Sequence, residues 1–188
     1  MLKQLRPALV MLALLTLLTG VVYPLVVTGI AQLIFPAQAN GSLLGDPDQP
    51  TGSALLGQAN DDSRYFWPRP SATGYTTLPS GASNLAPTSA TLAEQAMQRA
   101  NDFRAAHGLP TGVKVPVEMR FASGSGLDPH ISPDAARMQA SRVADARGLN
   151  EAQVLDLVDA HVEGPQLGIL GEPRVNVLLL NLALDRLQ

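Results

Sequence analysis

The sequence contains no cysteine, so disulfide bridges and thiolate metal ligands are both excluded. Its 13 basic residues are fewer than its 16 acidic ones, and no basic face large enough for nucleic acid is apparent. The three histidines, His107, His130 and His161, share no metal-ligand spacing. We therefore expect no metal site, no directly bound cofactor and no nucleic-acid partner.

Charge is absent altogether between Pro7 and Gly45. Within this stretch, residues 7–35 are almost entirely apolar, and they exceed the ~20 residues with which a helix crosses the hydrocarbon core of a bilayer. Residues 37–39 read A-x-A, as at a signal-peptide cleavage site, but the apolar run is much longer than a signal-peptide core of about 7–15 residues. The sequence predicts a retained transmembrane helix over residues 7–35.

The charges on either side of this run differ in sign. Lys3 and Arg6 precede it, and Asp46 is the first charge after it. By the positive-inside rule, residues 1–6 lie in the cytoplasm. The part of the chain after the predicted helix then lies outside the inner membrane, which in a Gram-negative cell means the periplasm.

The predicted membrane helix also carries small and polar positions. Thr16 and Gly20 form a small-xxx-small pair, and Gln32 is a polar group near the outer end. Both features favour packing of a membrane helix against other helices. We expect contacts with partner helices at these three residues and with lipid elsewhere.

Aromatic residues are scarce, at 4% of the chain, yet three of them are consecutive in the stretch DDSRYFWPRPS, residues 61–71. The stretch includes Trp67, the only tryptophan, and prolines 68 and 70 exclude a regular helix through it. Arg69 lies two residues from Trp67, which allows a cation–π contact. Such a loop is typical of a protein interface or of a satellite core beneath a loop; the sequence leaves both open.

The chain between the predicted anchor and residue 86 is rich in Pro, Gly and Asn. Leu43-Leu44 and residues 54–56 are the only candidates for brief strands. An irregular stretch of this length is uncommon in a compact domain and suggests a functional or partner-covered surface. We interpret residues 36–86 as a loop-rich connector and docking region.

Regular structure is predicted for residues 87–188. A first helix has a capping box at Thr91 and Glu94 and stops at Gly108. A second helix is capped by Ser132 and ends at Gly148. A third helix runs from Asn150 to Gly164-Pro165. Alternating apolar residues predict a strand over 113–121, at an edge or with a bulge because of Pro116. A last helix follows Asn176, with a strand possible before it. The fold class is α+β, a small mixed helix/strand domain after one membrane helix.

A hydrolase is the alternative reading of the segment SGSGLDPHIS, residues 123–132. Ser125, Asp128 and His130 supply the residue types of a catalytic triad. The nucleophile elbow needs G-x-S-x-G, however, and the first glycine is missing here. Asp128 and His130 flank a proline in a tight turn, where such side chains more often bind nearby backbone groups.

The order of several motifs resembles one family. YFWPRPSATGY, SGASNLAP, SGSGLDPHIS and LGILGEPRVNVLLLNLALD follow a short basic N-terminus and a single apolar helix. This arrangement is similar to that of the C subunit of the Kdp high-affinity potassium-transporting P-type ATPase, and the match runs almost end to end.

The resemblance implies a non-catalytic subunit with no catalytic residues of its own. Its implied partners are an A subunit with the potassium pathway, a B subunit that is the P-type ATPase, and a very small F subunit; the complex uses ATP and K⁺. The family is also described as a catalytic chaperone that raises the ATP affinity of the B subunit, through a segment that falls here on residues 149–153 and includes Gln153. For contact with partners we single out Tyr65, Phe66, Trp67, Arg69, Pro70, Ser83, Asn84, Ser125, Asp128 and His130.

Overall fold

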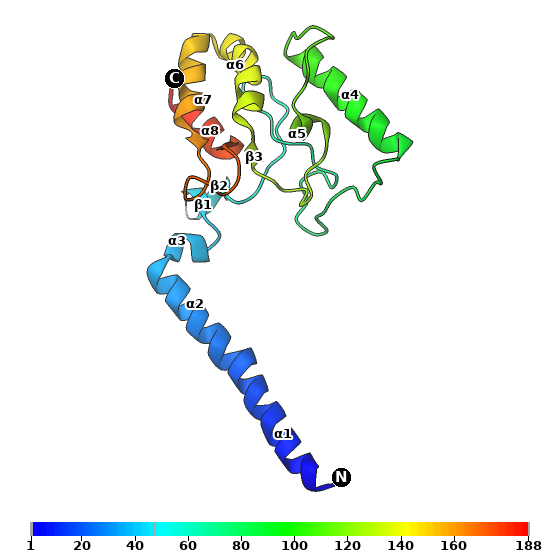
Figure 1. The fold of residues 1–188 in the computed structure, drawn as a ribbon. Coiled ribbons are helices and arrows are strands. Elements are labelled where there is room, and N and C mark those ends of the chain that lie inside the picture. The colour runs from blue at the N-terminus through cyan, green and yellow to red at the C-terminus, as the bar shows by residue number, and fades with distance from the viewer. Residues whose placement is uncertain (1, 47, 188) are drawn as a thin grey trace. The chain divides into compact units, whose positions relative to one another are not determined.

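The computed structural model describes residues 2–46 and 48–187 and divides the chain into two compact units, Met1–Ser53 and Ala54–Gln188 (Figure 1). Met1, Pro47 and Gln188 lie outside the described residues, so the first residue of the predicted cytoplasmic segment and the last residue of the predicted domain are not described. Each unit is treated separately below.

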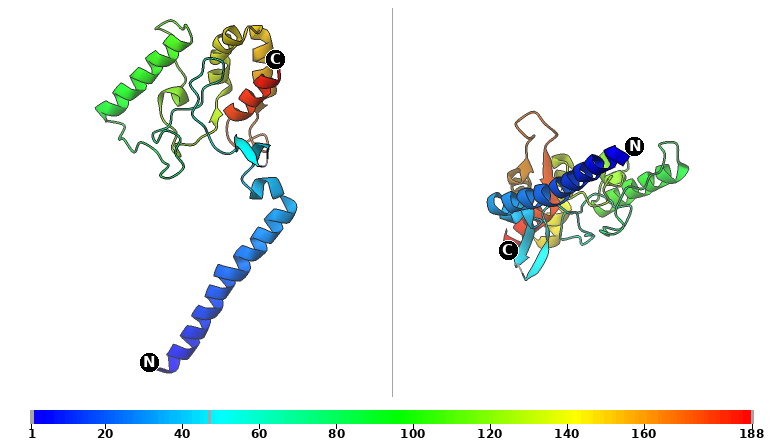
Figure 2. Two further views of the ribbon diagram at one scale, coloured as in Figure 1. Left: turned by 180° about the vertical axis from the view of Figure 1, so that it is seen from behind. Right: turned by 90° about the horizontal axis from the view of Figure 1, so that it is seen from below.

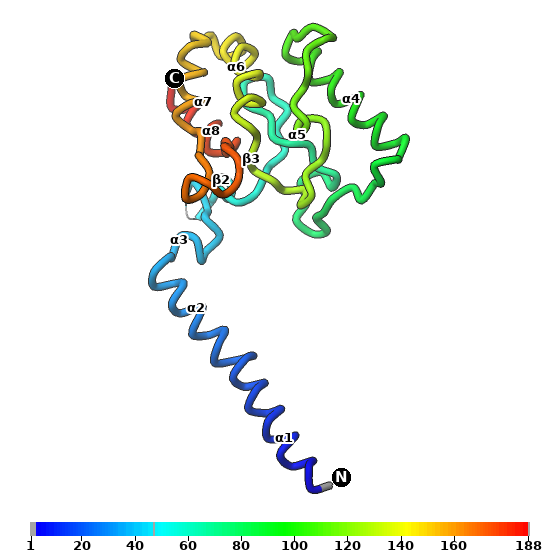
Figure 3. Tube along the Cα trace, viewed as in Figure 1, coloured from blue at the N-terminus to red at the C-terminus, as the bar shows by residue number. Residues whose placement is uncertain are grey.

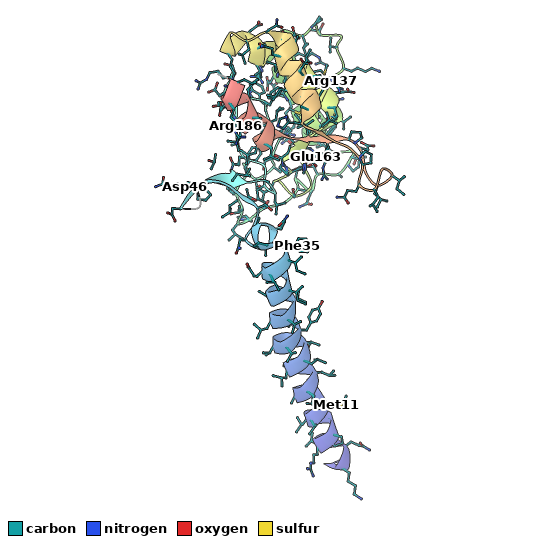
Figure 4. All side chains as sticks on the ribbon, turned by 90° about the vertical axis from the view of Figure 1, so that its left-hand side faces the viewer. Met11, Phe35, Asp46, Arg137, Glu163 and Arg186 are labelled. Carbon is teal, nitrogen blue, oxygen red and sulfur yellow. The ribbon has the colours of Figure 1, made fainter. Side chains whose placement is uncertain are left out.

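The first unit is dominated by one continuous helical segment, α1 (Leu2–Leu17), the π-helical turn η1 (Leu18–Val22) and α2 (Tyr23–Ile34). The Cα trace in Figure 3 follows this segment without a break. The π-helical turn immediately precedes Pro24, which has no backbone N–H to donate to the preceding turn. By length and composition, Lys3–Ile34 can cross a membrane, and Figure 4 shows its side chains, with Met11 labelled, directed outward all around the axis.

A short helix and a hairpin complete this unit. Helix α3 (Pro36–Ala39) follows directly, and strands β1 (Leu43–Asp46) and β2 (Gln49–Ser53) pair antiparallel with a bulge after Leu44. The strand expected at Leu43-Leu44 is confirmed. The strand expected at residues 54–56 is wrong, because these residues form a turn after β2. The strand that pairs with β1 comprises residues 49–53.

The second unit contains helices α4 (Ala90–Ala106), α5 (Val117–Arg120), α6 (Pro133–Arg147), α7 (Glu151–Ala160) and α8 (Val177–Leu184), and the 3₁₀ turn η2 (Asp185–Leu187). Its sheet has the order β3-β5-β4, from β3 (His130–Ile131), β4 (Val162–Glu163) and β5 (Arg174–Asn176), with both pairings antiparallel. Figures 1 and 2 show α6, α7 and α8 grouped together and α4 on the other side of α5. The α+β class is confirmed.

Most helix boundaries follow the capping signals in the sequence. Ser132, Asn150 and Asn176 each accept a backbone N–H as N-caps, and Gly148 ends α6 at a φ of 67° that favours glycine. The expected strand before α8 is present as β5. Helix α7, however, ends at Ala160 rather than at Gly164-Pro165, because residues 162–163 enter the sheet as β4.

Two further expectations are wrong. The N-cap of α4 is Ser89, which accepts the Leu92 N–H at 3.4 Å, so the capping box at Thr91 does not form. The strand expected over 113–121 is instead a loop followed by the single turn α5. Val115 and Met119 are buried, but Val117, on the same predicted face, is 64% exposed. No neighbouring strand pairs with this segment among the described residues, and Pro116 cannot donate to a sheet.

The core of the second unit is formed by α6, α7 and α8, by Phe66 from the irregular segment 54–89, and by buried residues of α4 and α5. Alanines at 135, 136, 140 and 144 line the buried face of α6 and are at most 1% exposed. Small side chains at these positions leave room for larger neighbours to pack closely against the helix. One of those neighbours is Phe66, which is 0% exposed and belongs to the same cluster.

Candidate functional site, the aromatic loop

The aromatic loop, defined here as residues 61–71, is fastened by two side-chain amides from the helices. Asn181 on α8 accepts the Phe66 N–H at 2.8 Å and donates to the Phe66 carbonyl at 3.0 Å. Gln139 on α6 does the same for Trp67, at 2.7 Å and 3.2 Å. Each amide therefore supplies the donor and the acceptor that a neighbouring strand would supply. The two residues hold a loop without secondary structure inside the core.

Arg142, one turn after Gln139 on α6, also binds the loop. Its guanidinium donates to the carbonyl of Tyr65 at 2.8 Å, to the carbonyl of Ser63, and to Gln139 at 3.1 Å. It also lies over the Trp67 ring, 4.6 Å from the centroid. Burial lowers the pKa of Arg142 to about 10, so the group is charged at neutral pH.

Arg147, at the end of α6, fastens the start of the loop. It donates to the carbonyl of Arg64 at 2.7 Å, pairs with Asp185 at 2.7 Å, and lies over the Tyr65 ring at 4.5 Å. Its side chain is 3% exposed although it is charged. Hydrogen bonds from Arg64 lower the pKa of Asp62 to about 2, and this exposed pair shapes the first turn of the loop.

The expected contact between Arg69 and Trp67 is wrong. Arg69 pairs instead with Asp128 at 2.7 Å, and it is Arg142, distant in sequence, that stacks on Trp67. Arg69 is held by the carboxylate of Asp128, whereas α6 brings Arg142 directly to the ring. Arg69 thereby links the aromatic loop to the turn that follows Ser125.

That turn satisfies its own polar groups. Ser125 Oγ accepts the Leu127 N–H at 3.1 Å, and Asp128 accepts the His130 N–H at 3.0 Å while its other oxygen binds Arg69. The His130 ring lies 3.5 Å from Asp128, but the serine hydroxyl is used as a turn acceptor. The hydrolase alternative is not supported by this arrangement.

The same turn is closely packed by the irregular segment. Ser80 donates to the Ser125 carbonyl at 2.5 Å, and a Cβ at Gly126, whose φ is 74°, would come within 2.9 Å of the Gly81 carbonyl. A Cβ at Gly57 would come within 2.6 Å of the Asp128 carbonyl. Two of the motifs that carry the family resemblance, SGASNLAP and SGSGLDPHIS, therefore meet in space. The remaining site candidates in the first motif, Ser83 and Asn84, are exposed.

His107, the C-cap of α4, is held as a neutral ring. Its Nδ1 lies 2.6 Å from the Phe103 carbonyl and its Nε2 lies 3.0 Å from Arg142 Nε. Because Arg142 can only donate, Nε2 must accept and the proton is on Nδ1. Burial lowers the pKa of His107 to about 4, and the charge of Arg142 acts in the same direction.

This ring makes the stability of the domain depend on pH. The pKa of His107 is about 4 in the fold and about 6.5 in an unfolded chain, so between these values only the unfolded state binds the proton. Lowering the pH from 7 to 5 should therefore reduce the free energy of unfolding, by about 1 kcal/mol when the partial exposure of the ring is allowed for. Urea unfolding of the full chain in detergent at both pH values measures this.

His107→Gln is the matched control, because its amide oxygen can accept from Arg142 and does not titrate. The loss of stability between pH 7 and 5 should shrink in this variant. Equal losses in both proteins would show that His107 is not the group responsible.

The remaining predicted residues do not join the aromatic loop. Gln153 is exposed on the first turn of α7, where Asn150 accepts the Ala152 N–H at 2.8 Å and so forms the N-cap. His161 Nδ1 lies 2.8 Å from the Leu157 carbonyl. Within residues 2–46 and 48–187, no three His, Cys, Asp or Glu side chains are grouped so that they could hold a metal ion. In the first unit, the Gln32 side chain pairs with that of Asn40, at 3.3 and 3.2 Å.

Gln139, Asn181, Arg142 and Arg147 were not singled out from the sequence. The available signal was weak: Gln139 and Asn181 are polar residues at helix positions that also face the core, where an unpaired amide would be costly. Nothing in the linear order indicates that their partners are 72 and 115 residues away.

These observations define a class of protein. Within the described residues, one helix is long and apolar enough to cross a membrane, and the polar groups around the aromatic loop hold that loop in place. This is the construction of a membrane-anchored protein with a small α+β domain. The family described as "K+-transporting ATPase, c chain" (KdpC) matches residues 5–186, and the chain belongs to this family.

Similar proteins cover the chain almost completely. The "Potassium-transporting ATPase KdpC subunit" of Sorangium cellulosum (strain So ce56) is 58% identical, over 98% of this chain and 98% of the relative. Proteins of the same name from Rhodospirillum rubrum and Geobacter sulfurreducens are 56% and 50% identical, each over 98% of this chain and over 96% and 98% of the relatives. The resemblance inferred from the sequence motifs is thereby confirmed.

Proposed function

We propose that this protein is a non-catalytic accessory and assembly subunit of an ATP-driven potassium uptake complex. Its relatives are named as subunits of a potassium-transporting ATPase. The helix over Lys3–Ile34 would anchor the chain beside the channel-like A subunit and the ATPase B subunit, with the small F subunit nearby. Lys3 and Arg6 support an orientation with the N-terminus in the cytoplasm and the domain in the periplasm.

The observation that carries this proposal is an exposed apolar loop in the second unit. The apolar hairpin loop, residues 164–172, joins β4 to β5 and extends beyond Glu163 (Figure 4). Leu167, Ile169 and Leu170 are 89%, 82% and 55% exposed. Exposed apolar side chains that lie close together on a surface mark an interaction site.

The hairpin loop has a defined backbone despite this exposure. Gln166 and Leu170 exchange backbone hydrogen bonds of 2.8 and 2.9 Å. Leu167 has a φ of 54°, in the left-handed region that a leucine rarely adopts. A strained residue with its side chain directed into solvent is characteristic of a site whose role lies outside the chain itself.

The chemistry of this loop favours a protein partner over a lipid surface. Residues 164–171 carry no charge and no aromatic ring, and Glu163 and Glu172 flank them. Binding at a membrane surface usually relies on Lys, Arg, Trp or Tyr, whereas the basic residue that follows this loop, Arg174, is paired with Glu163 at 3.0 Å. We assign the loop to an apolar pocket on the extracytoplasmic surface of the A subunit.

A double substitution tests this assignment. Leu167→Asp with Ile169→Asp should reduce the amount of A and B subunits that co-purify with this chain about tenfold or more, because two charges would have to enter an apolar pocket. Detergent pull-down from native membranes measures it, together with potassium-dependent ATPase activity. Met97→Asp, at a 58% exposed residue of α4, is the control; full recovery of partners by the double variant would refute the docking role.

The aromatic loop would contribute to docking through its shape. Phe66 is fully buried and acts from within the core, whereas Tyr65, Trp67, Arg69 and Pro70 keep part of their surface accessible. Ser83, Asn84, Ser125, Asp128 and His130 lie on or next to the two motifs packed against it and remain candidate contacts. The proposed helix contacts are Thr16, Gly20 and Gln32.

We also propose that any effect of this subunit on ATP affinity is indirect. In the orientation proposed above, Gln153 lies outside the membrane while the ATPase headpiece lies inside. Its segment, LNEAQ, contains no glycine, and its asparagine is used as a helix cap. Transmission through the anchor helix and the A subunit supplies a physical route that direct contact by Gln153 lacks.

A further inference from the structure

A second feature of the domain is an open groove between the end of α4, the loop before α5, and the first turns of α6. It has a volume of about 840 Å³ and is lined by residues that include Arg104, Lys114, Arg120 and Met138. Figure 1 shows α5 between α4 and α6. The groove is remote in sequence from the hairpin loop and contains none of the residues proposed above for docking.

Three cations line this groove without a carboxylate partner among the described residues. Arg104 donates only to neutral acceptors, the Val113 carbonyl at 2.8 Å and Asn101 at 3.2 Å. Lys114 is exposed and forms no ion pair. Arg120 also forms no ion pair, and its guanidinium lies over the Phe121 ring, 5.5 Å from the centroid. None of these three charges is therefore matched by an ion pair within the described residues.

Among the described residues, neither acidic side chain in the groove forms an ion pair with one of these three cations. Glu118 accepts the Ser132 N–H at 3.3 Å, and Asp134 pairs with Arg137 at 3.3 Å. Residues 54–188 as a whole contain more acidic than basic side chains, 14 against 11. Positive charge is therefore concentrated locally in a domain of net negative charge, which indicates a site for an anion rather than a general basic surface.

We propose that this groove binds the phosphate group of an amphiphilic ligand. A single carboxylate has too few acceptor oxygens to use three cations fully. A phosphate offers more acceptor oxygens to guanidinium and ammonium donors. Val115, Val117 and Met138 line the same groove, and Val117 is 64% exposed. This apolar surface suits the apolar part of a phospholipid. Free inorganic phosphate would contact only the cations of the groove.

Calorimetric titration of the full chain in a non-ionic detergent tests the proposal. The probes are inorganic phosphate, a short-chain phosphatidylglycerol, and a phosphatidylcholine with the same chains. Binding of phosphatidylglycerol above that of phosphatidylcholine supports the anionic amphiphile, and equal affinity for inorganic phosphate assigns the site to the free anion instead. Absence of binding by all three probes overturns it.

Two variants then locate the site. Lys114→Glu and Arg120→Gln should each weaken phosphatidylglycerol binding about tenfold, which corresponds to about 1.4 kcal/mol. Arg186→Glu makes the same charge change as Lys114→Glu at an exposed position outside the groove and should leave binding unchanged. Equal weakening by Arg186→Glu would show that net charge, not the groove, governs binding. Recovery of partner subunits is a separate measurement, so failure here leaves the docking proposal intact.

Discussion

Replacing Arg142 by methionine should lower the free energy of unfolding by about 3–5 kcal/mol. The substitution keeps a long side chain but removes the donors that satisfy the carbonyls of Ser63 and Tyr65 and the Nε2 of His107. It also removes the cation that lies over Trp67. A partly buried carbonyl that is left without a donor costs more free energy than the loss of one exposed hydrogen bond.

The same substitution on the same helix provides the control. Arg137 on α6 is 44% exposed and forms surface ion pairs with Asp134 and Asp159, which are worth about 0–1 kcal/mol. Urea unfolding of Arg142→Met and Arg137→Met in detergent, followed by circular dichroism, should separate them clearly. Equal stabilities would mean that Arg142 does not hold the aromatic loop.

Replacing Phe66 by alanine should have an effect of similar size, about 3–5 kcal/mol. The ring is 0% exposed and packs in the main core cluster, so its removal leaves a cavity that the backbone cannot close. The backbone there is held on both sides by Asn181 and Gln139, which prevents the loop from collapsing inward. Trp67, the only tryptophan and the next residue, reports the unfolding by its fluorescence.

Met97→Ala on α4 is the control for this experiment. Its side chain is 58% exposed, and substitutions at such positions usually change stability by about 0.5 kcal/mol or less. Phe66→Leu, which preserves most of the volume, should lie between the two. If Phe66→Ala proved as stable as Met97→Ala, the loop would not be part of the core in solution.

Local signals in the sequence predicted the elements whose causes are local. Ser132, Asn150 and Asn176 cap helices because an oxygen there can accept an N–H two or three residues ahead. The apolar run was evident for the same reason, since its length and lack of charge are properties of the segment itself. The family was evident because several motifs occur in a specific order.

Local patterns failed where distant residues decided the outcome. The alternation over 113–121 is that of a strand, yet no neighbouring strand pairs with it among the described residues, and Val117 is 64% exposed while Val115 and Met119 are buried. Thr91 and Glu94 match a capping box, but Ser89 caps the helix because α4 begins one residue after it. Arg69 is close to Trp67 in the sequence, yet the cation that lies over the Trp67 ring is Arg142 from α6.

The sequence alone determined the membrane helix, the α+β class, most of the helix ends and the family. Only the tertiary structure decided what the aromatic loop does within the domain. Its rings and backbone are held by Gln139, Asn181, Arg142 and Arg147, all more than 70 residues further along the chain. Hydrogen bonds and packing depend on which groups the fold brings within a few ångströms, and short sequence patterns carry no record of those distances.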